Sequence, residues 1–403
     1  MITMPIMPLM TGFPPPREGQ VTLANWRTAP FNRWAFQHVR EIVPSADIPH
    51  APERIWALPS APADLSRFSF DHDGAQLDFD SFLTATDTDG IVIMHRGAVV
   101  AERYAHGMAR ATPHILMSVS KSLLGIAAGI LAGKGMLDPD EPVTRLIPEI
   151  ANTAYAGATI RSLLDMRVGI HFDEDYLATS GPIVAYRKAA NWNPVDPGDA
   201  PINLRSFFQH LTRTDGDHGG RFHYVSPNTD LMGWVIERAA GTRYADLLST
   251  LLWRPMGAEH GAYITVDRLG APRCAGGVCA TVMDLARVGQ LMVQEGKRDA
   301  IQIIPKEWLD DIVVNGSPDA WNSGDFAHLF GDGPMHYRSK WYVARSDEPI
   351  VFGYGIHGQH LFVDRANELV IAKVSSQALP IDEKRISLTM HGIAALRRHM
   401  VAT

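Results

Sequence analysis

The sequence predicts a mixed α/β protein in which both ends of the chain build one antiparallel sheet flanked by helices. Strand-forming pairs occur near residues 91–104 and again near residues 360–374. The intervening region, from about residue 137 to residue 273, carries mainly helix signals. A chain with this order is expected to close its sheet with its own C-terminal strands and to leave the middle as a helical insertion.

Composition indicates a large globular core and excludes several kinds of partner. The chain has 403 residues, of which 46% are hydrophobic and 20% charged, and its formal net charge is −7. This charge argues against nucleic acid or an anionic membrane as the main partner. The sequence contains no run of about 18 apolar residues, the length needed to cross a bilayer. Cys274 and Cys279 are the only cysteines and suit neither a disulfide framework nor a zinc site. We therefore expect a reduced, cytoplasmic protein.

Three parts are expected along the chain. Residues 1–50 are rich in proline and tryptophan and predict an arm that lies over a domain. Residues 51–136 and 274–403 would form the α/β domain, residues 137–273 the mainly helical region, and the active site would lie between them. The N-terminus has no basic segment ahead of its apolar residues, so we expect no signal peptide, and Met10 is an alternative start.

The first strand pair and the helix after it are predicted from local patterns. Residues 91–95 and 98–104 flank Arg96-Gly97 and indicate a hairpin. A helix is predicted to begin at Ser118, and its residues 122–133 are apolar or small on nearly every side. A helix of this kind is buried in a large core.

The middle and C-terminal elements follow from cap and turn signals. Residues 191–201 contain three prolines and predict a loop. A second hairpin is expected from residues 360–364 and 369–374, and residues 384–400 predict a closing helix. Capped helices are expected at three further places, which are residues 159–166 behind Thr159, a helix capped by Asn228-Thr229-Asp230 that reaches Arg238, and a helix that starts at Thr281 with Asp284 three residues on.

Ser118 and Lys121 form the only Ser-x-x-Lys of the chain. Residues three apart lie on one face of a helix, about one turn from each other. A serine is a weak nucleophile near neutral pH, and an adjacent amine could take its proton without a histidine. The positive end of the helix dipole would also face Ser118. The alternative is a chance occurrence of a short pattern.

A second candidate lies in residues 222–228, just before a predicted helix. Tyr224 in such a loop could pass a proton to a leaving group, because burial or a neighbouring cation can move the pKa of a tyrosine or lysine by several units. The alternative is that Tyr224 is a packing aromatic and that Asn228 is only a helix cap.

Residues 352–359 form a glycine-rich strand, Phe-Gly-Tyr-Gly-Ile-His-Gly-Gln. Glycines in a strand allow a substrate to approach the backbone closely, and the amides of such a strand could donate to an oxyanion. The alternative is an ordinary glycine-rich hairpin turn.

Together these three ordered segments resemble the serine β-lactamase and penicillin-recognising superfamily. The resemblance is greatest to its class C-like branch, which includes family VIII carboxylesterases and the 6-aminohexanoate-dimer (nylon oligomer) hydrolases. It covers roughly residues 90–376 and includes further similar segments, namely 135–138, 160–164, 233–241 and 276–281. It implies a β-lactamase/penicillin-binding-like fold.

The resemblance also implies roles for individual residues. Ser118 would be the acylated nucleophile, Lys121 its general base and Tyr224 the proton shuttle to the leaving group. The backbone amides of Ser118 and Ile356 would form the oxyanion hole.

Two departures from the β-lactamase pattern bear on the substrate. Ser226 stands two residues after Tyr224, where β-lactamases carry asparagine, and the nearest asparagine is Asn228. Residues 353–355 take the place of Lys-Thr-Gly without a cation, although His357 is nearby. Both changes remove groups that hold an antibiotic, so hydrolysis of β-lactams is not expected as the main activity.

Other residues are weaker candidates for substrate contact. The acidic loop 173–176 could place an aromatic lid, Tyr176, and a carboxylate over the pocket, although it could equally be a solvated loop. Trp341 could be a pocket wall or a core residue. With Asn228, Gly355 and His357, these complete the predicted substrate contacts. The histidines show no metal-binding pattern, so we expect neither a metal nor a cofactor.

The sequence thus predicts a serine hydrolase that cleaves amides or esters of small substrates through an acyl-enzyme. The alternatives are a transacylase, a D-amino-acid peptidase or a weak β-lactamase of the same fold, and, outside enzymes, a silent penicillin-binding-like sensor. The expected partner is a small molecule, with no nucleic acid or membrane, and a homodimer is allowed.

Overall fold

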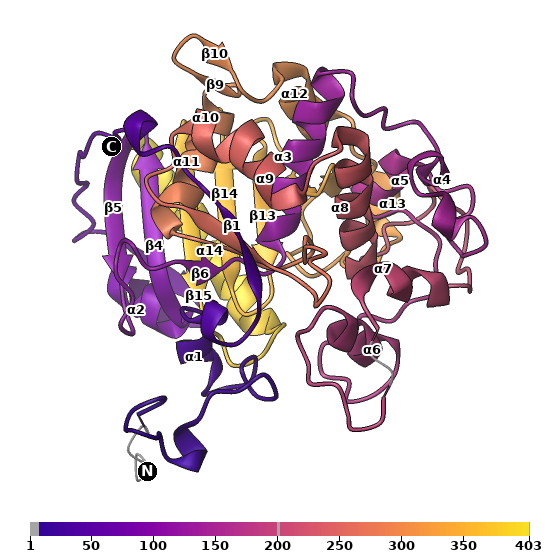
Figure 1. Ribbon diagram of the computed structural model, residues 1–403. Coiled ribbons are helices and arrows are strands. Elements are labelled where there is room, and N and C mark those ends of the chain that lie inside the picture. Colours follow the sequence, from indigo (N-terminus) through magenta and orange to yellow (C-terminus); the bar gives the residue numbers. More distant parts are fainter. Residues whose placement is uncertain (1–7, 200–201, 403) are drawn as a thin grey trace.

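One seven-stranded antiparallel sheet joins the two ends of the chain, as predicted (Figure 1). The computed structural model describes residues 8–199 and 202–402. Strand β15 from the C-terminal part pairs with β4 from the N-terminal part, with Ile371 opposite Ile93. In spatial order the strands are β11 (Met335–Arg338), β12 (Trp341–Ala344), β13 (Ile350–Gly355), β14 (Gln359–Asp364), β15 (Leu369–Ser375), β4 (Thr88–His95) and β5 (Ala98–Tyr104).

The two predicted hairpins are confirmed as β4–β5 and β14–β15, and the alternation of their side chains separates two cores. Val92 and Val370 belong to a core under α3 (Val119–Gly133) and α11 (Val282–Val293). Ile93 and Ile371 belong to a second core that includes residues of α2 (Phe79–Ala85) and α14 (Glu383–Ala402). Successive strand residues face opposite sides, so the sheet lies between two layers of helices, and α14 is the predicted closing helix.

A second, four-stranded sheet was not predicted. Its order is β1 (Ser45–Ile48), β7 (Ala262–Thr265), β8 (Val278–Ala280) and β6 (His114–Ile115). Strand β1 lies in the predicted arm and β7 in the predicted helical region, so the arm is tied into the fold by strand pairing. These strands have two to four residues each, too few for a hydrophobic alternation to stand out in the sequence.

The region between the two parts of the sheet is mainly helical, as predicted, and Figure 1 shows it beside α3. Thr159 and Thr281 cap their helices as predicted, each accepting from a backbone N–H three residues on. Residues 191–199 form no helix or strand, and the end of that predicted loop lies outside the described residues. The division into domains stays a prediction. The helices are α4 (Val143–Leu146), α5 (Ile160–Leu164), α6 (Pro182–Ala189), α7 (Leu204–Phe207), α8 (Ser226–Ala240), α9 (Tyr244–Leu248) and α10 (Arg254–Met256).

The predicted start of α8 is wrong by three residues, because the cap was expected at Asn228 and is Val225. The helix begins at Ser226, so Asn228, Thr229 and Asp230 lie inside it rather than capping it. Pro227 stands at the second helical position, where its fixed φ suits a helix start. The carboxylate of Glu174 accepts from both the backbone N–H and the hydroxyl of Ser226. A distant side chain therefore caps this helix.

The remaining elements are short and lie at the edges of these layers. No helix of the described residues has the length and apolar character needed to cross a bilayer. The edge elements are α1 (Asn32–Ala35), β2 (Ser69–His72), β3 (Ala75–Asp78), β9 (Lys297–Arg298), β10 (Ile301–Gln302), α12 (Lys306–Val314) and α13 (Pro318–Asn322).

Candidate active site

Ser118 and Lys121 meet at the N-terminus of α3. Ser118 is the residue before the first helical position, and its Oγ lies 2.8 Å from Lys121 Nζ. The same amine donates to the carbonyl oxygen of Ala275 at 2.7 Å. The preceding residue, Met117, has a φ of 44°, in the left-handed region that side chains rarely occupy. Strain of this kind is concentrated at functional sites, where the surrounding structure holds it.

Burial makes Lys121 a candidate base. Its side chain is almost fully buried, and this desolvation lowers the pKa of Lys121 from 10.5 to about 7, with Arg273 adding to the shift. The carboxylates of Glu174 and Asp230 act in the opposite direction but do not cancel the effect of burial. An amine with a pKa near 7 is largely neutral at slightly alkaline pH and can accept the proton of Ser118.

Asp230 positions the segment 273–275, which in turn contacts the amine of Lys121. Its Oδ1 accepts from the backbone N–H of Ala275 at 2.7 Å, and its Oδ2 accepts from Tyr186 and pairs with Arg273. Ala275 in turn presents its carbonyl to Lys121. Asp230 is therefore a positioning residue that acts on the amine through the 273–275 segment.

Tyr224 completes the group at Ser118. Lys121 Nζ lies 4.9 Å from the centroid of the Tyr224 ring. Burial, reinforced by Glu174, raises the pKa of Tyr224, while a hydrogen bond with the Ser118 side chain opposes that shift. Tyr224 therefore keeps its proton near neutral pH, which suits a donor to a leaving group.

Asp325 fixes the backbone around Tyr224. Its Oδ2 accepts from the Tyr224 N–H at 2.9 Å and lies 2.8 Å from Nδ1 of His223. Phe326 packs on the Tyr224 ring with centroids 4.8 Å apart. No local pattern indicates this support, because Asp325 is about a hundred residues away in the chain.

The glycine strand passes close to the amide of Ser118. A side chain at Gly355 would place its Cβ 2.9 Å from Ser118 N and 2.8 Å from the carbonyl oxygen of Leu116, so only glycine fits there. Ile356 follows directly and lines the same cavity as Ser118. The two amides predicted for the oxyanion hole thus belong to neighbouring segments, and their role stays a prediction.

A small cavity of about 30 Å³ lies at Ser118, between the sheet and the helical region. Of the predicted substrate contacts, Tyr176 lines it. A larger cavity of about 350 Å³ adjoins it, and His357 lines that one. Four residues line both cavities and therefore stand between them, namely Arg27, Tyr176, Arg187 and Ile356. Beside these and Ser118, the inner cavity is lined by Met117, Glu174, Ile183, Trp192, Ser226, Arg273, Ala275 and Gly276.

The acidic loop does place a carboxylate and an aromatic side chain at the cavity. Glu174 accepts from the Tyr176 hydroxyl at 2.7 Å and from Ser226 at the start of α8. The serine that replaces the β-lactamase asparagine is thus a partner of this loop. Glu174 and Ser226 were not predicted as site residues, because their contact joins segments 52 residues apart.

Two predicted substrate contacts lie elsewhere. Asn228 is fully buried and its Oδ1 accepts from the Tyr155 hydroxyl at 3.0 Å. Trp341 is also fully buried and belongs to the core under α3. Neither lines the cavity at Ser118. Trp341 is therefore a core residue, which was its stated alternative, whereas Asn228 is neither a substrate contact at this cavity nor the predicted helix cap.

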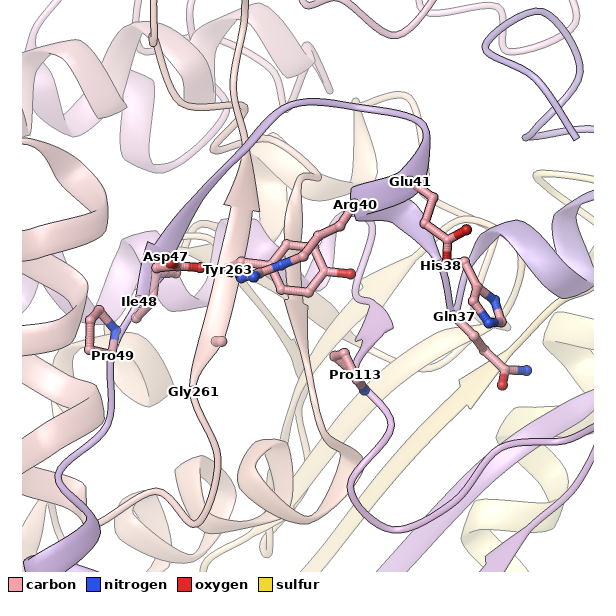
Figure 2. Close-up of a pocket in the computed structure, with 11 residues that line it drawn as sticks. Gln37, His38, Arg40, Glu41, Asp47, Ile48, Pro49, Pro113, Gly261 and Tyr263 are labelled. Atoms are coloured by element: carbon pink, nitrogen blue, oxygen red, sulfur yellow. Dashed lines mark hydrogen bonds and ion pairs between the residues drawn. The ribbon is translucent and has the colours of Figure 1, made fainter.

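Another cavity, of about 530 Å³, lies against the arm and the smaller sheet (Figure 2). Figure 2 shows Arg40 extended across Tyr263, with its guanidinium carbon 3.9 Å from the ring centroid, and Asp47 pairs with Arg40. None of Ser118, Lys121 and Tyr224 lines this cavity. It is therefore separate from the candidate active site.

Comparisons with known proteins show which family the chain resembles. The β-lactamase family matches residues 79–390. The chain is 36% identical to a 6-aminohexanoate-dimer hydrolase of Paenarthrobacter ureafaciens over 366 residues, which is 90% of each protein. It is 27% identical to esterase EstB of Burkholderia gladioli over 44% of this chain and 45% of that protein.

Solved structures share the fold. A candidate 6-aminohexanoate-dimer hydrolase from Bacillus anthracis superposes with a TM-score of 0.84, at 26% identity, over 96% of this chain and 98% of that one. A D-stereospecific amidohydrolase from Streptomyces gives a TM-score of 0.58 at 16% identity, over 77% of this chain and 97% of that one.

Proposed function

The chain belongs to the β-lactamase family and is a serine hydrolase of amide or ester bonds, and on that premise we propose that Ser118, Lys121 and Tyr224 carry the reaction. The observation that supports this most is the contact of 2.8 Å between Ser118 Oγ and a lysine amine whose pKa burial has lowered to about 7. A serine paired with an amine that is largely neutral above pH 7 is an activated nucleophile.

Acylation would proceed in three proton transfers. Lys121 takes the proton of Ser118 as Oγ attacks the substrate carbonyl carbon, and the carbonyl oxygen becomes an oxyanion held by the amides of Ser118 and Ile356. Tyr224 then donates its proton to the leaving nitrogen or oxygen as that bond breaks, and recovers a proton from Lys121. Loss of one oxyanion donor typically costs about 10²–10³-fold in rate.

Deacylation repeats the same steps with water as the nucleophile. Water loses a proton to the base, attacks the acyl carbon and releases Ser118, which is protonated again. The acid product leaves and no co-reactant is required.

The substrate is proposed to be a small linear amide or ester rather than a β-lactam. Residues 353–355 supply no cation. The amine of Lys340 does not replace this cation, since it is buried and already donates to the carbonyl oxygen of Leu163 at 2.6 Å. The relative from Paenarthrobacter ureafaciens supports a linear amide such as an ω-amino-acid oligomer. A cytoplasmic location and a homodimer stay proposals as well.

A substrate screen tests the proposal. Wild-type protein and Ser118→Ala are compared on p-nitrophenyl butyrate, 6-aminohexanoate dimer and nitrocefin. We expect the wild type to turn over the ester and the amide far faster than nitrocefin, and Ser118→Ala to turn over none. Efficient hydrolysis of nitrocefin alone would contradict the proposed substrate class.

A further inference from the structure

Arg27 and Arg187 line the boundary between the inner and outer cavities without a carboxylate partner. Arg27 donates to the Asn193 side chain at 2.5 Å, and Arg187 donates to backbone carbonyls, of which Tyr176 O at 2.9 Å is the nearest. Across residues 8–199 and 202–402, neither guanidinium has an Asp or Glu oxygen within 4.0 Å. Arg273, the third arginine at the cavity, is paired with Asp230.

The positive charge at this boundary is only partly compensated. Burial lowers the pKa of Arg27 to about 9, and the charges of Arg187 and Arg273 add to that shift. The Nε atom of Arg27 is buried and has no hydrogen-bond partner. Among the described residues, Glu174 is the only acidic one that lines the inner cavity, and its oxygens already accept from Ser226 and Tyr176.

We propose that Arg27 and Arg187 bind a carboxylate of the substrate, so that the enzyme prefers amides or esters that carry an acid group near the scissile bond. This inference rests on the proposed function, because it places the carboxylate beside Ser118. A guanidinium offers a planar fork of N–H donors that matches a carboxylate.

The arm supplies one half of this pair. Trp26 donates from Nε1 to the carbonyl oxygen of Trp192 at 3.0 Å, and the Arg27 guanidinium carbon lies 5.8 Å from the centroid of the Trp192 ring. Arg187, in α6, comes from the helical region. The proposed carboxylate would therefore join the arm to the helical region at the entrance to Ser118.

The test uses esters that differ by one added carboxylate group. The anionic probes are mono-p-nitrophenyl glutarate, with the carboxylate on the acyl side, and 3-carboxy-4-nitrophenyl butyrate, with the carboxylate on the leaving group. The neutral reference is p-nitrophenyl butyrate. The readout is the ratio of kcat/KM between an anionic probe and the neutral reference, measured for wild type, Arg27→Gln, Arg187→Gln and Arg187→Lys. Arg40→Gln, outside both cavities, is the matched control.

We expect the wild type to prefer at least one anionic probe. Each glutamine variant should lower that ratio by about 10-fold to 100-fold through KM, as for loss of a charged hydrogen bond. Arg187→Lys should restore part of the ratio, and Arg40→Gln should leave it unchanged. No preference for either anionic probe, or a ratio that the glutamine variants leave intact, would overturn the inference. Failure of the proposed function is distinct, because wild type would then hydrolyse no ester in a Ser118-dependent way.

Discussion

Lys121 is the residue whose environment does most to create the proposed chemistry. In water its amine would be protonated at neutral pH and could not accept a proton. Burial at the start of α3 removes that hydration and lowers the pKa of Lys121 to about 7, while Ser118 and Ala275 keep its hydrogen bonds satisfied. Burial disfavours the charged form of the amine, and the neutral form that results can act as a base.

The pH dependence of the reaction should report this amine. The reactive form of Lys121 is neutral, and its fraction rises as the pH increases through the pKa. We expect kcat/KM for p-nitrophenyl butyrate to rise up to about pH 7 and to level off above pH 8. A profile that keeps rising to pH 10, as for an ordinary lysine, would contradict the role of burial.

Lys121→Ala should lose nearly as much activity as Ser118→Ala, and the double variant should lose little more than either single variant.

Tyr224 should matter most for poor leaving groups. An amine leaves only when protonated, whereas p-nitrophenolate leaves unaided, so Tyr224→Phe should reduce kcat/KM on an amide far more than on its p-nitrophenyl ester. The difference is measured with one acyl group in both substrates. Equal losses of kcat/KM on the amide and the ester would contradict the proton-donor role and indicate that Tyr224 only packs against Phe326.

Helix α3 owes its position to glycines on one of its faces. Gly125, Gly129 and Gly133 recur every four residues, and a Cβ at each would overlap Ser339, Trp308 and Pro305, respectively. This close approach lets the segment around Ser339 and the residues near α12 pack directly on the helix that carries Ser118.

Gly125→Ala tests this packing. Alanine normally stabilises a helix by up to about 1 kcal/mol relative to glycine, but here its methyl group would meet the carbonyl oxygen of Ser339. We expect a loss of about 1–3 kcal/mol in the free energy of unfolding, as for overpacked cores, measured by urea denaturation. Gly333→Ala is the control, because nothing lies within 4 Å of its Cβ. An increase in stability for Gly125→Ala would refute the account of this face.

Local patterns predicted what local geometry determines. The contact of Ser118 with Lys121 follows from a spacing of three residues on a helix, and the hairpins and caps at Thr159 and Thr281 follow from neighbouring residues. Glu174 with Ser226, Asp230 with Ala275, and Arg27 with Trp192 join distant segments, so no spacing indicates them. Asn228 and Trp341 illustrate the converse, because a polar or aromatic residue near a motif gives no sign of which way its side chain points.

At the scale of the whole molecule, the arm is part of the structure that encloses the site. Trp26 is almost fully buried, and its ring meets that of Trp192 edge to face with centroids 5.1 Å apart. Strand β1 pairs with β7. The site therefore depends on contacts between the arm, the helical region and the sheet.

Replacing Trp26 should affect both stability and activity. Trp26→Ala leaves a cavity and should cost about 3–5 kcal/mol, seen as a lower Tm at fixed scan rate, and it should reduce kcat/KM because it loosens Trp192 and Arg27. Trp34→Ala, at a partly exposed residue of the same arm, is the control and should change both quantities less. If the two variants behaved alike, the arm would not be a specific part of the site.

The central claim is that Ser118 is the covalent nucleophile, and mass spectrometry of the intact protein tests it most directly. After brief reaction with a fluorophosphonate probe, the serine oxygen displaces fluoride, and we predict one added phosphonyl group per chain (the probe mass less HF), located by peptide mapping on Ser118, in the wild type and none in Ser118→Ala. Labelling should slow strongly in Lys121→Ala. A probe mass on another residue, or equal labelling of Ser118→Ala, would contradict the assignment of Ser118 as the nucleophile.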